Sequence, residues 1–233
     1  SSQKKGIYLQ ENQGWEFDFI GAWREFGHGE LIGVPHSTVR FWDLRYFFDS
    51  RLYRKNSNFD FPFPDKVAVN GAMARNQYIY GGYAETNLVE VEALRYLQLE
   101  KIASSKENVS DQEVENVNNV LVLGDYLQKN TKKQMVLLEK AQSLINVQVN
   151  FIVKPHPICP ISDQDYNEID MLVSDQQIDI LIDNCVMAYT SSTTSAAVDA
   201  YCAGMKVVTV LDEATLNLSP LRGCKGVSFV RTS

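Results

Sequence analysis

The segment Asn150-Phe151-Ile152-Val153-Lys154-Pro155-His156-Pro157 joins a short apolar strand to a rigid polar turn. Residues 150–153 favour a β-strand, and the two prolines end it because proline has no backbone N–H for a strand ladder. Lys154 and His156 then stand at the carboxyl end of that strand. In open parallel sheets this edge is where ligands bind. The segment therefore predicts an α/β domain with a ligand site beside Lys154 and His156.

Strands and helices alternate on both sides of this segment, which is the signature of parallel sheets with helices on their faces. We expect strands at residues 6–10, 30–34, 66–69, 88–91, 119–123, 186–189, 206–211 and 226–230. Helices are expected at residues 15–26, 72–80, 131–145, 166–172 and 193–203, with Thr131 as the N-cap of the third.

Residues 101–118 interrupt this alternation. They are rich in Ser, Glu, Asn and Lys and nearly free of large apolar side chains. We interpret them as a linker between a partial Rossmann-like domain at residues 1–100 and a second Rossmann-like domain at residues 119–233.

Composition and charge narrow the class of function. The net charge of -7 and the pI near 5.0 argue against nonspecific nucleic-acid binding, which requires cations to neutralise phosphates. The four cysteines form no CxxC pair, which predicts no zinc site and favours a reduced, cytoplasmic compartment. No apolar run approaches the roughly 20 residues of a membrane span, and residues 1–12 do not resemble a signal peptide. Membrane association is therefore expected to be peripheral, at the inner face of the cytoplasmic membrane.

A second polar segment, Thr190-Ser191-Ser192-Thr193-Thr194-Ser195, lies between an expected strand and an expected helix. Its hydroxyls, backbone N–H groups and helix start are suited to a phosphate. The alternative is an N-cap alone, just as His156 is either a donor to a ligand or the capping residue of a rigid turn. Neither a GxxxxGKS loop nor a GxGxxG fingerprint is present.

Together these two segments resemble the carboxy-terminal domain of GT-B glycosyltransferases. The resemblance rests on KPHP, the serine pair about 35 residues later, the small-residue helix and Gly204-Met205-Lys206-Val207-Val208. More narrowly, it is to bacterial polysialyltransferases, Kdo transferases and CDP-glycerol glycerophosphotransferases. It implies an α/β fold of two Rossmann-like parallel-sheet domains, the first partial because the chain is a fragment or a compact variant. It also implies a set of nucleotide- and phosphate-binding residues: Lys154, His156, Pro157, Ser191, Ser192 and Thr193.

Two residues of the first half are candidates for the catalytic base. Glu11, in Glu11-Asn12-Gln13-Gly14, resembles the acidic-residue-plus-glycine motif of polysialyltransferases, and a carboxylate there can deprotonate an acceptor hydroxyl. Its alternative role is to cap the following helix. His36 follows Gly33-Val34-Pro35 at a place where related glycerophosphotransferases and epimerases use histidine, and its alternative is a turn histidine bonded to backbone.

The resemblance implies an inverting glycosyltransferase of surface-carbohydrate biosynthesis that uses neither metal nor cofactor. The donor would be a nucleotide-sugar, with a CMP-sugar favoured, and the acceptor a glycan or lipid-linked glycan. The alternatives are a CDP-glycerol glycerophosphotransferase, a nucleotide-sugar 2-epimerase or a non-catalytic nucleotide-binding module. An aromatic, basic stretch is either an acceptor-binding face or a packed surface: Arg40, Trp42, Arg45, Tyr46, Phe47 and Arg51.

Overall fold

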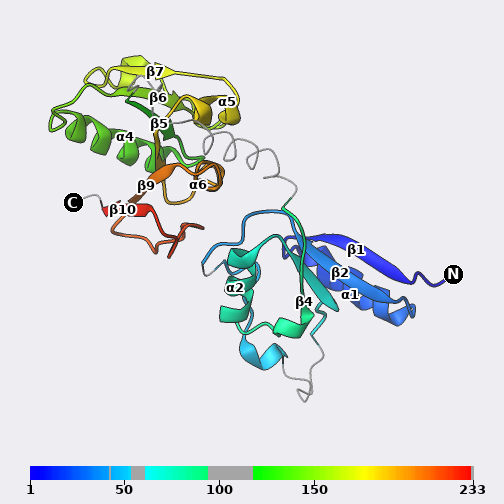
Figure 1. The fold of residues 1–233 in the computed structure, drawn as a ribbon. Helices are drawn as coiled ribbons and strands as arrows, with labels where there is room; N and C mark the ends of the chain where they lie inside the picture. The colour runs from blue at the N-terminus through cyan, green and yellow to red at the C-terminus, as the bar shows by residue number, and fades with distance from the viewer. Residues whose placement is uncertain (42, 54–60, 94–117, 232–233) are drawn as a thin grey trace, which may run out of the picture. The chain divides into compact units, whose positions relative to one another are not determined.

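The structure is a computed structural model that describes residues 1–41, 43–53, 61–93 and 118–231 (Figure 1). The chain divides into two compact units, Ser1–Leu94 and Arg95–Ser233. Each unit contains a parallel sheet with helices, so the expected α/β fold class with two Rossmann-like sheets is confirmed. The linker expected at residues 101–118 lies outside the described residues, except for Asn118.

The first unit is built on a four-stranded parallel sheet in the order β1-β2-β3-β4. Helix α1 follows β1 and helix α2 follows β3, as the alternation of the sequence predicts. Tyr8, Ile20 and Leu31 form one core cluster, and a second cluster contains three buried tyrosines. The elements are β1 (Lys5–Gln10), α1 (Gly14–Glu25), β2 (Glu30–Pro35), η1 (Ser50–Tyr53), β3 (Lys66–Val69), α2 (Ala72–Tyr80), η2 (Glu85–Asn87) and β4 (Leu88–Glu90).

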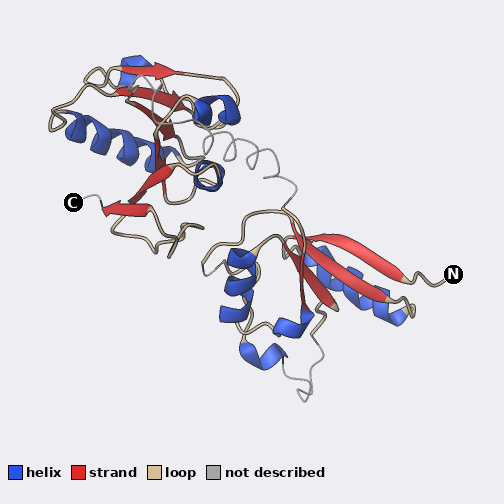
Figure 2. Ribbon diagram, in the orientation of Figure 1, coloured by secondary structure: helices blue, strands red, loops and turns tan. Residues whose placement is uncertain are grey.

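The second unit is built on a six-stranded parallel sheet in the order β10-β9-β8-β5-β6-β7. Figure 2 shows helices packed on the strands of this unit. The elements are β5 (Asn119–Leu123), α4 (Gln128–Gln142), β6 (Asn150–Lys154), η4 (Asp163–Asp165), β7 (Met171–Val173), α5 (Ile178–Asp183), β8 (Met187–Ser191), α6 (Ala196–Cys202), β9 (Lys206–Leu211) and β10 (Val227–Arg231).

Strand β5 lies at the centre of this sheet and is buried on both faces. Leu121 and Leu123 pack in a cluster with residues of α5 and α6, whereas Val120 and Val122 pack in a cluster with residues of α4. After β5 the chain crosses the α4 face to β6, and after β8 it crosses the α6 face to β9. The neighbours β5 and β8 therefore send their connections to opposite faces and directions. Such a topological switch point is where α/β sheets bind ligands.

Three local predictions for the second unit were wrong. The helix expected at residues 166–172 is instead η4 and the strand β7, because Met171 pairs with Phe151 at the sheet edge. Thr131 is not an N-cap: α4 begins earlier, after Leu127, and the Thr131 hydroxyl bonds to the backbone of Asp125. The helix expected at residues 193–203 begins only at Ala196, because Thr190 and Ser191 belong to β8 and residues 192–195 turn the chain into the seven-residue helix α6.

Within the described ranges, no helix is both long enough and apolar enough to cross a bilayer.

Candidate functional site

The two polar segments singled out in the sequence lie at one edge of the second sheet. Leu123 at the end of β5 pairs with Lys154 of β6 on one side and with Thr190 of β8 on the other. The residues that follow these three strands therefore leave the sheet side by side. The loop after β5 lies between His156 and the hydroxyl run, so both segments flank the switch point.

Asp125 joins the hydroxyl run to the loop after β5. Its carboxylate is fully buried and accepts hydrogen bonds from the hydroxyls of Ser191 and Thr193. The Leu127 N–H donates to its other oxygen at 2.8 Å, in a turn that leads into α4. The sequence analysis missed Asp125, although the rule that found His156 and Ser191 also points to the residues after β5.

This arrangement limits what the hydroxyl run offers to a ligand. Ser191 and Thr193 give their hydroxyl protons to Asp125, and their oxygens accept from the Thr193 N–H and from Asn130 Nδ2, so neither hydroxyl has a proton left for a ligand. Ser192 is also buried. A shallow pocket lies here, and its enclosed space holds about one water molecule; it is lined by Asn130, Lys133, Ser191, Ser192, Val210 and Asp212.

A lysine at this pocket is already paired. Lys133 Nζ lies 2.6 Å from Asp212 Oδ2, and this hydrogen bond, with a further one from the Ala214 N–H, lowers the pKa of the Asp212 carboxyl. A phosphate at the mouth of the pocket would compete with Asp212 for Lys133.

The KPHP segment forms a tight turn beside the loop after β5. The His156 carbonyl accepts from the Cys159 N–H at 2.8 Å, which places Pro157 at the second position of a β-turn, where its fixed φ is favoured. His156 Nδ1 accepts from the Ile158 N–H at 3.3 Å, so the neutral ring carries its proton on Nε2 and is a donor there. A Cβ on Gly124 would lie 3.2 Å from the backbone nitrogen of His156, so the glycine permits the close approach of these two loops.

Two further features surround this turn. Lys154 Nζ donates to the Asp175 carbonyl at 2.9 Å, which holds the ammonium group at the sheet edge. A larger pocket of about 330 Å³ lies between the start of α4 and the segment that follows the turn. It is lined by Gln128, Thr131, Lys132, Cys159, Pro160, Ile161, Asp165 and Tyr166.

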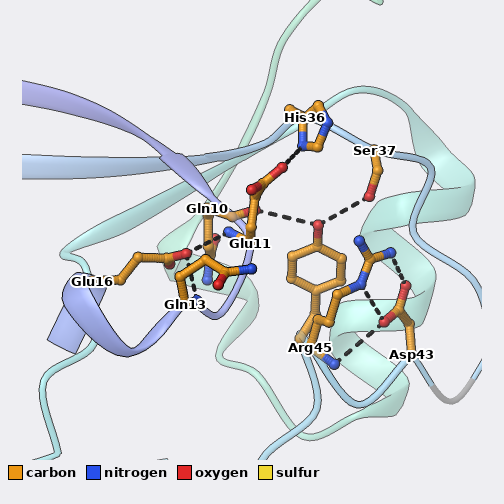
Figure 3. Close-up of polar contacts among 9 residues, drawn as sticks. Gln10, Glu11, Gln13, Glu16, His36, Ser37, Asp43 and Arg45 are labelled. Atoms are coloured by element: carbon orange, nitrogen blue, oxygen red, sulfur yellow. Dashed lines mark hydrogen bonds and ion pairs between the residues drawn. The ribbon is translucent and has the colours of Figure 1, made fainter.

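In the first unit, the two candidate bases contact each other. Gln10 and Pro35 are register partners at the ends of β1 and β2, so the next residues of both strands, Glu11 and His36, emerge together. His36 Nδ1 forms an ion pair with Glu11 Oε1, as Figure 3 shows. The sequence analysis treated these residues as alternatives, whereas the structure makes them one pair.

The local sequence directs Glu11 away from the helix. Asn12 has a left-handed backbone with φ of 59°, which turns the chain between β1 and α1. Glu16 Oε1 accepts from the backbone N–H groups of Glu11 and Gln13, both at 2.8 Å (Figure 3). Glu16 therefore caps α1, and Glu11 does not have the capping role that was considered for it.

The aromatic, basic stretch is mostly a packed surface where the structure describes it. Tyr46 is buried, and its hydroxyl lies between Ser37 and the Gln10 carbonyl (Figure 3). Arg45 binds Asp43 through two hydrogen bonds of 2.9 and 2.6 Å, and the Asp43 carboxylate raises the pKa of the Arg45 guanidinium. Arg51 is paired with Asp49 in the same way, and Trp42 lies outside the described residues.

Among the described residues, no group of three or more His, Cys, Asp or Glu side chains is arranged to hold a metal ion.

No protein-family model and no curated protein matches the chain. Among solved structures, Anabaena Alr3699/HepE in complex with UDP matches 88% of the chain with a TM-score of 0.51 and 17% identity. The chain spans 59% of the length of HepE. Acinetobacter baumannii MurG matches with a TM-score of 0.46 and 11% identity, covering 98% of this chain and 86% of MurG. The glycosyltransferase SnogD from Streptomyces nogalater matches with a TM-score of 0.43 and 10% identity, covering 99% and 87%. At this level of identity, the likeness to HepE is a likeness of fold: a chain of two parallel-sheet α/β units.

Proposed function

We propose that the chain belongs to a glycosyltransferase that moves a sugar from a nucleotide-activated donor to a hydroxyl of a glycan or lipid-linked glycan. One observation carries the proposal: the loops after β5, β6 and β8, with Asp125, His156 and the hydroxyl run, meet at a topological switch point. The fold likeness to HepE, whose structure contains UDP, supports a nucleotide ligand for this edge.

In this proposal the second unit holds the donor. His156 Nε2–H and Lys154 are donors to the nucleotide, and Pro157 fixes the turn that presents them. Ser192 and Lys133 line the pocket at whose mouth a phosphate would lie, and Ser191 and Thr193 shape it through Asp125. Donors that are fixed in place stabilise the charge that builds up on a departing phosphate.

The first unit activates the acceptor, with the base among Glu11 and His36. The proposal extends to an inverting, metal-independent reaction in surface-carbohydrate biosynthesis, at the inner face of the cytoplasmic membrane. For the donor, a CMP-sugar is the choice from the motif resemblance, and the UDP in HepE makes a UDP-sugar the competing choice.

A thermal-shift panel of CMP, CDP, UMP, UDP and GDP tests the donor site. A nucleotide that binds only the folded chain at about 100 times its Kd stabilises it by about 2.7 kcal/mol, so the Tm rises. We expect a pyrimidine nucleotide to raise the Tm most. No shift with any of the five nucleotides would refute the proposal.

His156→Ala tests the residue assignment. Loss of a hydrogen bond to a charged ligand costs about 1.5–3 kcal/mol, which weakens nucleotide binding roughly 10- to 100-fold. The matched control is His28→Ala, because His28 lies in the other unit, where its Nδ1 accepts from the Gln3 N–H. Equal affinities for the two variants, measured by calorimetry, would remove His156 from the site.

Turnover assays separate the remaining possibilities. Release of CMP or UDP from a nucleotide-sugar, with no product from CDP-glycerol, supports sugar transfer, and unchanged turnover in a chelator supports metal independence. Nucleotide binding without transfer to any acceptor would instead favour a binding module.

A further inference from the structure

The larger pocket of the second unit lies beside the proposed nucleotide site and is not part of it. Its volume of about 330 Å³ is in the range of pockets that hold small molecules. One wall is the start of α4, and the other is the segment from Cys159 to Tyr166, which includes η4. Neither Lys154, His156 nor the hydroxyl run lines it. A ligand in this pocket would therefore be bound in addition to a nucleotide.

The two walls carry opposite charges that are not paired with each other. Lys132 belongs to α4, and Asp165 lies on the opposite wall, at the end of η4. Within the described ranges, neither side chain has an ion-pair or hydrogen-bond partner, whereas the neighbouring Lys133 is paired with Asp212. An ammonium group and a carboxylate that line one cavity without partners can each bind an opposite charge of a ligand.

The uncharged lining favours a polar ligand with a compact carbon skeleton. Gln128 has an amide and Tyr166 a phenol hydroxyl, both without a hydrogen-bond partner among the described residues. Burial, together with the neighbouring Asp165 carboxylate, raises the pKa of the Tyr166 phenol, so the hydroxyl keeps its proton and can donate it. Pro160 and Ile161 add apolar surface to the same wall. These groups suit a molecule of monosaccharide size that carries hydroxyls.

Two buried residues of the lining contact the groups that organise the nucleotide site. The Cys159 N–H closes the KPHP turn by donating to the His156 carbonyl at 2.8 Å. The Cys159 thiol lies 3.6 Å from the Thr131 hydroxyl, which accepts from the Asp125 N–H and donates to the Asp125 carbonyl. A ligand that packs on Cys159 and Thr131 would therefore support the turn that presents His156 and the loop that contains Asp125.

We propose that this pocket binds a zwitterion of monosaccharide size, with its anionic group at Lys132 and its cationic group at Asp165, and that this ligand strengthens nucleotide binding at the neighbouring sheet edge. Binding is noncovalent, and no bond forms or breaks. By reciprocity, the nucleotide strengthens binding of the zwitterion by the same factor. The coupling rests on the proposed function, whereas the zwitterion site rests only on the lining of the pocket.

Three compounds with the same sugar ring separate the two charges. Glucosamine 6-phosphate carries both, glucose 6-phosphate carries only the anionic group, and glucosamine carries only the cationic group. Loss of one charged contact at an exposed side chain should weaken binding roughly 5-fold. We expect calorimetry to give glucosamine 6-phosphate the highest affinity, by about that factor. Equal affinities for the three compounds, or no binding of glucosamine 6-phosphate at millimolar concentration, would overturn the proposal.

Two substitutions assign each charge to its residue. Lys132→Gln should weaken binding of the two phosphates and leave glucosamine unchanged, whereas Asp165→Asn should weaken binding of the two amines and leave glucose 6-phosphate unchanged. The matched controls, Lys140→Gln on α4 and Asp170→Asn after η4, are outside the lining and should change none of the three affinities. Losses that do not follow the charge of the compound would place the ligand elsewhere and overturn the assignment.

The coupling is tested by calorimetry with UDP and CDP, with and without saturating glucosamine 6-phosphate. Coupling between two sites is commonly about 5- to 150-fold, so we expect nucleotide binding to tighten by at least about 5-fold. An unchanged or weaker nucleotide affinity would overturn the coupling. If no nucleotide binds under either condition, the proposed function fails, and the series of three compounds still decides whether the pocket is a zwitterion site.

Discussion

Asp125 controls the polarity of the hydroxyl run. A buried carboxylate accepts hydrogen bonds and donates none, so Ser191 and Thr193 must turn their protons toward it. For either hydroxyl to donate to a phosphate, it has to leave a charge-assisted hydrogen bond, which is stronger than a neutral one. In the proposed phosphate site, Asp125 therefore lowers the affinity that these two hydroxyls can provide.

Asp125→Asn should tighten the binding of phosphate-bearing ligands by several-fold. The asparagine oxygen can keep the bond from the Leu127 N–H, while its NH₂ group donates to the two hydroxyls and frees their protons, at the loss of the 3.4 Å contact from Asn130 Nδ2. Calorimetry with CDP or UDP measures the change, and Asp183→Asn on the exposed side of α5 is the matched control. Adding Ser191→Ala should cancel much of the gain. If Asp125→Asn weakens binding, the carboxylate serves only to hold the loop.

Four residues of the candidate sites could be predicted from the sequence, but their partners could not. His156, Ser191, Glu11 and His36 were found because each follows an apolar strand, and strand ends are visible in a single sequence. The bond from Asp125 to Ser191 spans 66 residues, and the pairing of Glu11 with His36 depends on the register between two strands. Neither leaves a local pattern, so neither was predicted.

At the scale of elements, α4 ties together the two strands that part at the switch point. Gln134 of α4 is fully buried, and its Nε2 donates to the Leu123 carbonyl of β5 at 3.1 Å and to the Tyr189 carbonyl of β8 at 3.2 Å. The Tyr189 hydroxyl returns a bond to the Gln134 carbonyl at 3.0 Å. The helix therefore satisfies backbone groups of both strands just before the site begins.

Gln134→Met should destabilise the second unit while keeping the volume of the side chain. Two buried carbonyls would lose a donor, and a buried group left without a partner costs about 1–3 kcal/mol. Urea unfolding measures the free energy, and Lys140→Met, at an exposed position of the same helix, should leave it nearly unchanged. An equal effect of the two substitutions would show that the amide bridge adds no stability.

Most elements were predictable because the spacing of their apolar residues and the glycines, prolines or polar residues that end them indicate the same bounds. Strands β3 and β9 and helix α2 have the expected bounds. Strand β7 was mistaken for a helix because Tyr166 and Ile169, three residues apart, both point into the core without being helical. The pairing of β7 with β6 determines that residues 171–173 form a strand. A tertiary contact of this kind cannot be predicted from the local sequence.

At the scale of the whole molecule, the two units have cores of different chemistry. Burial raises the pKa of Tyr8, Tyr78 and Tyr83 in the first unit, and it raises that of Tyr53 to about 12. Among the described tyrosines of the second unit, Tyr189 has a comparable rise. A buried phenol resists ionisation in the folded state and ionises near pH 10 in the unfolded chain.

The first unit should therefore lose more stability at alkaline pH than the second, in which burial also raises the pKa of the Cys202 and Cys224 thiols. Below about pH 10 both states keep their phenol protons, and above it the unfolded chain releases protons that the folded unit retains, so the free energy of unfolding falls. Tryptophan fluorescence follows the first unit, which contains all three tryptophans, and methionine methyl NMR signals follow the second, which contains four of the five methionines.

We expect the urea midpoint of the first unit to decrease more steeply between pH 9 and 11. Tyr53→Phe should make that decrease shallower, because one group that ionises only on unfolding is removed. Parallel decreases for the two units would contradict this account.

The register of β1 and β2 determines that Glu11 and His36 lie next to each other. One residue added to or removed from either strand would shift its end by about 3.3 Å and turn the next side chain to the opposite face. The first part of the connection between β2 and β3 also constrains the pair, because the Tyr46 hydroxyl bonds to Ser37 and to the Gln10 carbonyl. Natural or engineered changes of length should therefore be tolerated in that connection after Tyr46 and excluded from the two strands, so the sheet itself sets where this chain can vary.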